Sequence, residues 1–208
     1  MKVVIDQLIR SKRKTLSLQI KSDGSLVVRA PMRYDISRID RFIAEKNKWI
    51  ITKQSEMKNR FILRNEILAK QELSRNDGIL FLGEKTKFSF QNLSNKTEII
   101  ALYKREALKY IVPKLEYFTA KINTKYRAVK ITSAQKRWGS CSARGNVNFS
   151  WRLIMAPKEI VDYVIAHETA HLLHKNHSAR FWNCVETMIP DYKNCHLWLR
   201  KNGFLLDL

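Results

Sequence analysis

The stretch from Pro157 to His177 reads PKEIVDYVIAHETAHLLHKNH, and it decides how the C-terminal half of the chain folds. Pro157 suits the first turn of a helix, because its missing amide hydrogen would be unpaired there in any case. The spacing predicts one helix from Pro157 to about His174. His167 and His171 are four residues apart, so their imidazoles project from one face of that helix and can share one cation.

Glu168 completes a His-Glu-x-x-His motif and falls inside the apolar stripe of the predicted helix. At about 100° per residue, Val164, Ile165 and Leu172 lie on the same side as Glu168. Burying an unpaired carboxylate costs several kcal/mol, so this position argues for a charge partner such as a metal-bound water. A general base would occupy this position. The alternative is a surface helix whose histidines only happen to pair.

Two histidines supply half of a tetrahedral shell, and a catalytic zinc site needs one more protein ligand and an open position. His174 shares the helix face, but three ligands along one straight helix would place the first and last about 10 Å apart. His177 follows a predicted turn, so the reversing chain can bring its imidazole over the metal. We favour His177 and keep His174 as the alternative. Zinc is the expected cofactor, one per chain, although imidazole also suits nickel, cobalt and iron.

Strand and helix patterns alternate along the rest of the chain, and we predict an α+β protein. The predicted strands are 2–9, 15–21 and 25–30, which form a small antiparallel sheet, the hairpin 79–82 and 87–90, and 128–133 and 146–155. The predicted helices are 36–60, 100–122 with Pro113 as a kink or break, 157–174, one after Ser178, and 195–201. Residues 1–98 are expected to form a basic β-rich N-terminal lobe with one amphipathic helix, and residues 99–208 the metal-binding domain.

Positive charge is concentrated before the metal motif. The chain has 39 Lys and Arg against 19 Asp and Glu, a formal net charge of +20. The excess is +10 over residues 1–70, +9 over 71–150 and +1 over 151–208. Such an excess favours anionic partners, so nucleic acid or a nucleotide is an expected partner of the N-terminal lobe. A well-solvated basic surface is the alternative.

Three cysteines, Cys141, Cys184 and Cys195, are an odd number without C-x-x-C spacing. They suit reduced thiols better than a disulfide framework. The first residues lack a signal-peptide pattern, and no run approaches the roughly 20 apolar residues of a membrane helix. We therefore expect a cytoplasmic protein without a membrane partner.

Short motifs follow one another through the C-terminal half: Arg137-Trp138-Gly139-Ser140-Cys141-Ser142, Asn148, Trp151-Arg152-Leu153, Ala156-Pro157, Tyr163-Val164, His167 to His171, Asn176-His177-Ser178 and Phe181-Trp182. In this order and spacing the chain resembles the YgjP-like metallopeptidases, a branch of the zincins related to the SprT-like proteases. A weaker resemblance at Leu82-Gly83 and in the N-terminal strands extends it over most of the chain.

The resemblance implies His167, His171 and His177 as metal ligands and Glu168 as the catalytic residue. It also implies a zincin-like catalytic domain whose active-site helix packs on a small antiparallel sheet. The chain departs from the family at Thr169, where the family usually has Leu. A Thr hydroxyl can bond to a backbone carbonyl one turn back, so we expect a small packing change and no loss of chemistry.

Four further residues are candidates for substrate binding: Arg137, Trp138, Asn148 and Arg152. Guanidinium groups suit a carboxylate, a phosphate or an oxyanion, although an ordinary surface salt bridge is the alternative. An aromatic residue followed by Gly is more often a packed turn. In a peptidase, the strand containing Asn146 to Arg152 is expected to lie along the cleft and to align an extended substrate by strand addition.

These observations predict a metal-dependent hydrolase, and first a zinc metallopeptidase that uses a metal-activated water with Glu168 as general base. Its substrates would be peptides or proteins, including proteins associated with nucleic acid. One alternative is a metal-dependent nucleoside triphosphate pyrophosphohydrolase whose basic residues hold the phosphates. Another is a nucleic-acid-binding module with a structural metal, which explains poorly why Glu168 lies beside the histidines.

Overall fold

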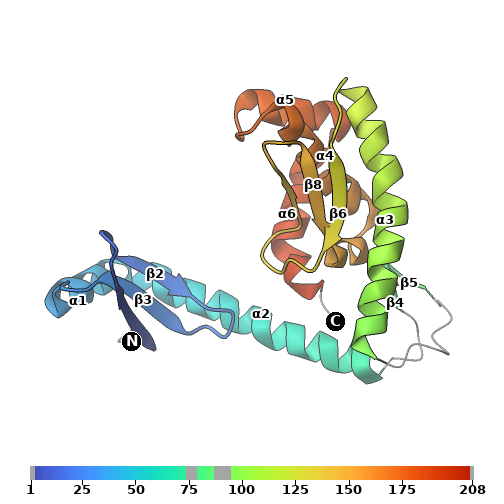
Figure 1. The fold of residues 1–208 in the computed structure, drawn as a ribbon. Helices are drawn as coiled ribbons and strands as arrows, with labels where there is room; N and C mark the ends of the chain where they lie inside the picture. The colour runs from blue at the N-terminus through green and yellow to red at the C-terminus, as the bar shows by residue number, and fades with distance from the viewer. Residues whose placement is uncertain (1–2, 74–78, 87–94, 207–208) are drawn as a thin grey trace. The chain divides into compact units, whose positions relative to one another are not determined.

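The computed structural model describes residues 3–73, 79–86 and 95–206 (Figure 1). The chain divides into two compact units, Met1–Glu72 and Leu73–Leu208. Each unit has its own core of buried apolar residues. Short sheets and long helices occur in both, which confirms the predicted α+β class. The predicted division fell between residues 98 and 99, whereas the compact units divide between residues 72 and 73.

The first unit contains a three-stranded sheet with the strand order β1-β3-β2. Its strands are β1 (Gln7–Ser11), β2 (Ser17–Ile20) and β3 (Leu26–Pro31). β2 runs antiparallel to β3, but β1 runs parallel to it. The sheet is therefore mixed, where the sequence predicted an antiparallel one. Leu26, Val28 and Ala30 of the central strand are buried in a core that the following helices share.

The predicted helix over residues 36–60 is two helices, α1 (Ile36–Glu45) and α2 (Asn47–Leu73). Asp35 caps the first one by accepting a hydrogen bond from the backbone N–H of Ser37. Lys46 lies between them and ends α1 with its N–H on the Phe42 carbonyl. Because Ile43 and Ile50 are seven residues apart and both buried, the apolar periodicity passes through the break without a visible change.

The second unit packs a three-stranded sheet against helices α3 and α4, and Figure 1 shows β6 and β8 side by side next to α3. The strands are β6 (Ala128–Thr132), β7 (Gly139–Cys141) and β8 (Asn146–Ser150), in the order β6-β8-β7. β6 runs parallel to β8 and β7 runs antiparallel to it. This sheet is also mixed, and the predicted antiparallel arrangement was wrong.

The helices of the second unit are α3 (Lys96–Lys121), α4 (Lys158–Leu173), α5 (Ala179–Met188) and α6 (Tyr192–Asn202), with a short 3₁₀ turn η4 (Gly203–Leu205). α3 continues through Pro113 without a break. The strand predicted to reach Met155 ends at Ser150, and the 3₁₀ helix η3 (Trp151–Met155) follows. Leu153 and Ile154 are both buried, so this run is not a strand with one exposed face.

A small hairpin, β4 (Ile79–Phe81) and β5 (Glu84–Thr86), belongs to the second unit. The Leu82 N–H donates to the Ile154 carbonyl over 2.8 Å, and the Tyr103 hydroxyl donates to the Leu80 carbonyl over 2.9 Å. These bonds explain why residues 79–86 group with the second unit. The second strand predicted at 87–90 lies outside the described residues.

Within the described residues, no helix is both long and apolar enough to span a membrane. Cys141, Cys184 and Cys195 are all free thiols.

Candidate metal centre

Helix α4 presents the motif, and its boundaries agree with the prediction to within a residue or so. Val161, Ile165 and Ala170 are completely buried and fix its position in the core. Thr169 is completely buried too, and its hydroxyl donates to the Ile165 carbonyl one turn back over 2.7 Å. This is the bond to the preceding turn that was expected of Thr169, and the helix continues through it.

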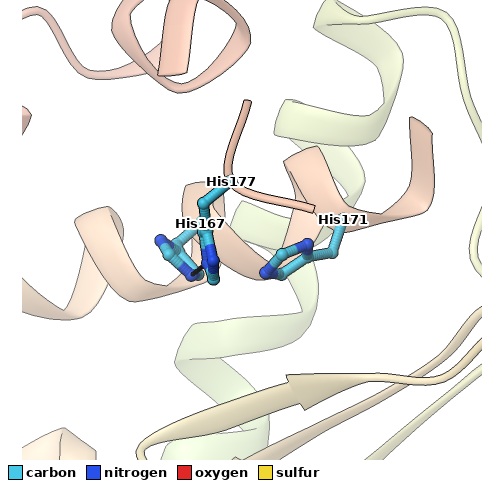
Figure 2. Close-up of side chains that lie close together, drawn as sticks. All are labelled: His167, His171 and His177. Carbon is cyan, nitrogen blue, oxygen red and sulfur yellow. Dashed lines mark hydrogen bonds between the residues drawn. The ribbon is translucent and has the colours of Figure 1, made fainter. Parts of the chain in front are cut away.

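Three histidines converge at the C-terminal end of α4. One ring nitrogen from each of His167, His171 and His177 can be chosen so that all three lie within 4.8 Å of one another. Figure 2 shows His167 and His171 on the helix and His177 on the segment that follows it, with its imidazole turned back toward them. The His174 side chain is not part of this cluster. The geometry therefore agrees with His177 as the third candidate ligand.

The hydrogen bond of His171 fixes which of its nitrogens is free. Its Nδ1 lies 2.9 Å from the carbonyl oxygen of His174. Because a carbonyl only accepts, Nδ1 carries the proton and Nε2 carries the lone pair. Burial, with smaller contributions from the neighbouring histidines, lowers the pKa of His167 to about 3. His167 is therefore neutral at physiological pH, as a metal ligand must be.

The donor set fits a tetrahedral cation such as zinc. Two nitrogens bound to one tetrahedral zinc at about 2.0–2.1 Å are about 3.4 Å apart. Nε2 of His167 and Nε2 of His177 are 3.2 Å apart. Three imidazoles leave one of four positions for water or substrate, which is the composition of a catalytic and not a structural zinc site.

Glu168 is buried beside this cluster, with 6% of its surface exposed. Its Oε2 is inaccessible and has no hydrogen-bond partner in the described part of the chain. Burial raises its pKa to about 7, and the positive charge of Arg137 acts in the opposite direction. A buried carboxyl without a partner is costly, so its presence here calls for a functional explanation.

Gly139 of β7 makes room for Glu168. A Cβ atom added at Gly139 would lie 2.5 Å from Glu168 Cγ and 2.7 Å from Oε1. The Glu168 side chain therefore packs directly on the bare backbone of β7. Any larger residue at position 139 would displace it.

Aromatic rings also contact the histidines. Phe181 lies with its ring centroid 4.5 Å from that of His171, and Trp182 stacks on His177 at 5.7 Å. The Tyr163 hydroxyl lies 3.1 Å from His196 Nδ1, and the Tyr163 ring makes an edge contact with His167. Sequence reasoning assigned no role to the Tyr163–His196 pair, because 33 residues separate its members and no local spacing signals their contact.

The predicted substrate-binding residues separate into two groups. Arg137, Trp138 and Asn148 all line one pocket of about 270 Å³ on the β6-β8-β7 sheet. Arg152 does not line it. Its guanidinium lies over the Trp151 ring at 4.4 Å and donates to the Ser133 carbonyl over 3.4 Å. These contacts give Arg152 a structural role, in packing on Trp151 and bonding to the Ser133 backbone. Ser140 also lines the pocket, as do Thr132 and Ser150, which were not predicted.

The expectation that residues 146–152 align a substrate by strand addition was wrong. β8 lies between β6 and β7, so both of its edges are already paired. β7 is one of the two edge strands of this sheet, and it is the one that packs against α4. Its short sequence, Gly139-Ser140-Cys141, gave no strand pattern.

Comparison with known proteins gives one family. The family description "YgjP-like, metallopeptidase domain" matches residues 14–99 and 91–202. No curated protein matches the chain. Among solved structures, that of the metallopeptidase zymogen of Pyrococcus abyssi abylysin is similar, with 22% sequence identity and a TM-score of 0.41. The match covers 45% of this chain and 95% of that one.

Proposed function

The chain belongs to the YgjP-like metallopeptidase family, and on that premise we propose that it is a zinc-dependent peptidase with its active site on α4. The observation that carries the proposal is the convergence of three histidine nitrogens beside a buried carboxyl that has no hydrogen-bond partner among the described residues. A structural metal would explain the histidines and leave the buried Glu168 without a role. Hydrolysis explains both.

In the proposed mechanism His167, His171 and His177 hold the zinc, and Glu168 moves the proton. The zinc, when bound, polarises a water molecule and lowers the pKa of that water to about 7. Burial raises the pKa of Glu168 to about 7 in the metal-free protein, and a nearby cation would act in the opposite direction; its carboxyl can therefore accept a proton at neutral pH and release it to the leaving amine. Gly139 and the packing of β7 hold its carboxyl in place.

The edge of β7 supports an alignment role in the same mechanism. An extended peptide can add to a free strand edge through main-chain hydrogen bonds. β7 packs against the helix that carries the histidines, and its Gly139 lies in contact with Glu168. A substrate strand along this edge would pass the reacting groups.

Nucleic-acid-associated proteins are the substrates that we propose for the basic chain. The excess of positive charge over residues 1–70 supports this choice, since it would retain the enzyme near polyanions. We also retain zinc over other divalent metals and a cytoplasmic location as proposals.

Replacing Glu168 by Gln tests the mechanism, with Glu159→Gln as the matched control on the exposed first turn of the same helix. Zinc-loaded wild type and variants are incubated with a panel of unfolded proteins and, separately, with nucleoside triphosphates. We expect Glu168→Gln to keep its zinc and to lose about 10²- to 10⁴-fold in protein turnover. Glu159→Gln should keep both. Equal turnover in wild type and Glu168→Gln, or hydrolysis of triphosphates alone, would refute the proposal.

A further inference from the structure

The sheet beside the site carries only positive charge. From Tyr117 to Lys158 the chain has nine Lys and Arg and no Asp or Glu. This segment contains the whole of β6, β7 and β8 and their connections. The charged side chains that this segment itself contributes around the sheet are therefore all basic, which favours anionic groups.

The pocket of about 270 Å³ lies on the outer face of that sheet. Side chains alternate along a strand, and Val147 and Phe149 of β8 face the core, so Asn148 and Ser150 face the other way. Ser140 is the cross-strand partner of Asn148, and Thr132 is that of Ser150. All four line the pocket.

The pocket offers donors and lacks an acidic group. Asn148 Nδ2 donates to Ser140 Oγ over 3.3 Å, so the Ser140 hydroxyl keeps its own hydrogen for another acceptor. The Asn148 amide has a second N–H to give. Arg137, which lines the pocket, is exposed. Its charge acts on Glu168, but no hydrogen bond or ion pair to a described residue engages it. A guanidinium with two neutral donors suits a carboxylate, which accepts several hydrogen bonds.

The pocket adjoins the proposed reacting groups. Gly139 belongs to its lining and also contacts Glu168. An extended substrate on the edge of β7 would place alternate side chains on the two faces of the sheet. A side chain on the outer face would then enter the pocket, while the neighbouring peptide group passes Glu168.

We propose that this pocket is a specificity subsite that binds the carboxylate of an acidic substrate side chain through Arg137, Ser140 and Asn148. The inference rests on the proposed function, because it names the substrate preference of the same site. It predicts that Glu or Asp occurs at one fixed position relative to the bond that is cut.

The test begins with the zinc-loaded, full-length enzyme and a digest of unfolded proteins whose cleavage sites are mapped by mass spectrometry. Peptides that differ only by Glu or Gln at the enriched position then give the ratio of the two kcat/KM values. We expect the wild type to favour Glu by roughly tenfold or more, as for a hydrogen-bonded charge. Because the Glu and Gln peptides are compared on the same enzyme, a general change in catalysis cancels in the ratio, and only the recognition of this side chain remains.

Arg137→Glu should abolish or reverse this ratio, and Ser140→Ala, a smaller change that removes one donor, should reduce it. Arg144→Glu is the matched control, because Arg144 is exposed in the turn between β7 and β8 and is not among the pocket residues. It should leave the ratio near the wild-type value.

Three results would overturn the subsite. Cleavage without acidic enrichment would show that the pocket does not select a carboxylate, with the peptidase intact. Equal loss of the ratio in Arg137→Glu and Arg144→Glu would assign the preference to the general positive field. Failure of the wild type to cleave any protein, or hydrolysis of nucleoside triphosphates alone, would remove the proposed function and the subsite with it.

Discussion

Gly139 has no side chain, and the Glu168 carboxyl, which we propose as the catalytic group, occupies the space that a side chain there would need. A Cβ at Gly139 would lie 2.5 Å from Glu168 Cγ. Gly139→Ala should therefore move the Glu168 carboxyl while the three histidines stay in place. A misplacement of about 1 Å can cost about 10²-fold in rate. We expect a loss of this size in protein turnover with zinc content unchanged, measured on the same preparations.

Gly145→Ala is the informative control for this substitution. A Cβ at Gly145 would meet nothing closer than 3.6 Å, but the residue has a φ of +78°. Alanine there should cost about 1–2 kcal/mol of stability through backbone strain alone. Turnover should remain normal below the melting temperature. Similar activity losses in both variants would mean that Gly139 acts only through folding.

Glu168 should also destabilise the metal-free protein at high pH. Burial raises its pKa from 4.5 to about 7. A raised pKa means that the folded state binds the proton more tightly than the unfolded state does. Stability from this group is therefore fully present below pH 4.5 and is lost as the pH rises to about 7. The difference amounts to about 3 kcal/mol at most.

Glu168→Gln removes this pH-dependent cost. With zinc chelated, the variant should be more stable than wild type at pH 8 and nearly equal to it at pH 4.5. Denaturant unfolding at the two pH values measures the difference. A variant that is less stable than wild type at pH 8 would mean that the carboxylate has a partner in the folded protein.

Site residues that lie close together in the sequence could be predicted from their spacing. Contacts between residues that are far apart in the sequence could not. His167 and His171 are four apart on one helix, and the structure brings His177 to them as proposed. Glu168 was predicted from the apolar stripe and is buried. Gly139 and Ser140 belong to a motif that could be read from the sequence as a cleft lining or as a packed turn. Their contacts with Glu168 and Asn148 depend on the packing of β7 against α4 and on its pairing with β8, which have no signature in the sequence.

At the scale of elements, Asp162 fixes α4 to α3. It is 9% exposed, and it accepts hydrogen bonds from the Tyr110 hydroxyl at 2.7 Å and from Lys114 Nζ at 2.9 Å. Asp162→Ala would leave both donors without this partner. We expect a loss of about 2 kcal/mol in the free energy of unfolding.

Lys109→Ala provides the comparison for that prediction. Lys109 also forms an ion pair on α3, with Glu106, but its side chain is 65% exposed. Such exposed pairs contribute at most about 1 kcal/mol. Urea unfolding of the two variants should therefore separate them clearly, and equal effects would remove the special role of Asp162.

Elements with a regular pattern were predicted well, and those whose course depends on tertiary contacts were not. α4 agrees with its prediction because a capping Pro and a continuous apolar face define it. The apolar alternation of β8 continued into η3, so the pattern did not reveal where the strand ends. The parallel pairings of β1 with β3 and β6 with β8 depend on crossovers, which strand patterns do not encode.

For the whole molecule, the charge of the N-terminal residues leads to a binding prediction. Arg38 and Arg41 are exposed on α1, three residues apart. If residues 1–70 bind nucleic acid, the full-length protein should bind duplex DNA with an affinity that falls steeply with salt. The double variant Arg38→Glu and Arg41→Glu should bind about tenfold more weakly at low salt, as measured by fluorescence anisotropy.

Arg200→Glu with Lys201→Glu, in the exposed last turn of α6, makes the same change in net charge elsewhere. If the two double variants weaken DNA binding equally, the binding depends only on the net charge of the protein. Absence of binding at low salt would withdraw nucleic acid as a partner of these residues.

The most direct test of the account is the zinc content and zinc affinity of wild type, His177→Ala and His174→Ala. The structure brings the His177 ring to the other two imidazoles, whereas His174 contributes its backbone carbonyl, which alanine retains. We predict one zinc per chain in wild type and in His174→Ala, and binding weaker by more than about 100-fold in His177→Ala. A wild type without zinc, or an unchanged His177→Ala, would contradict the central claim.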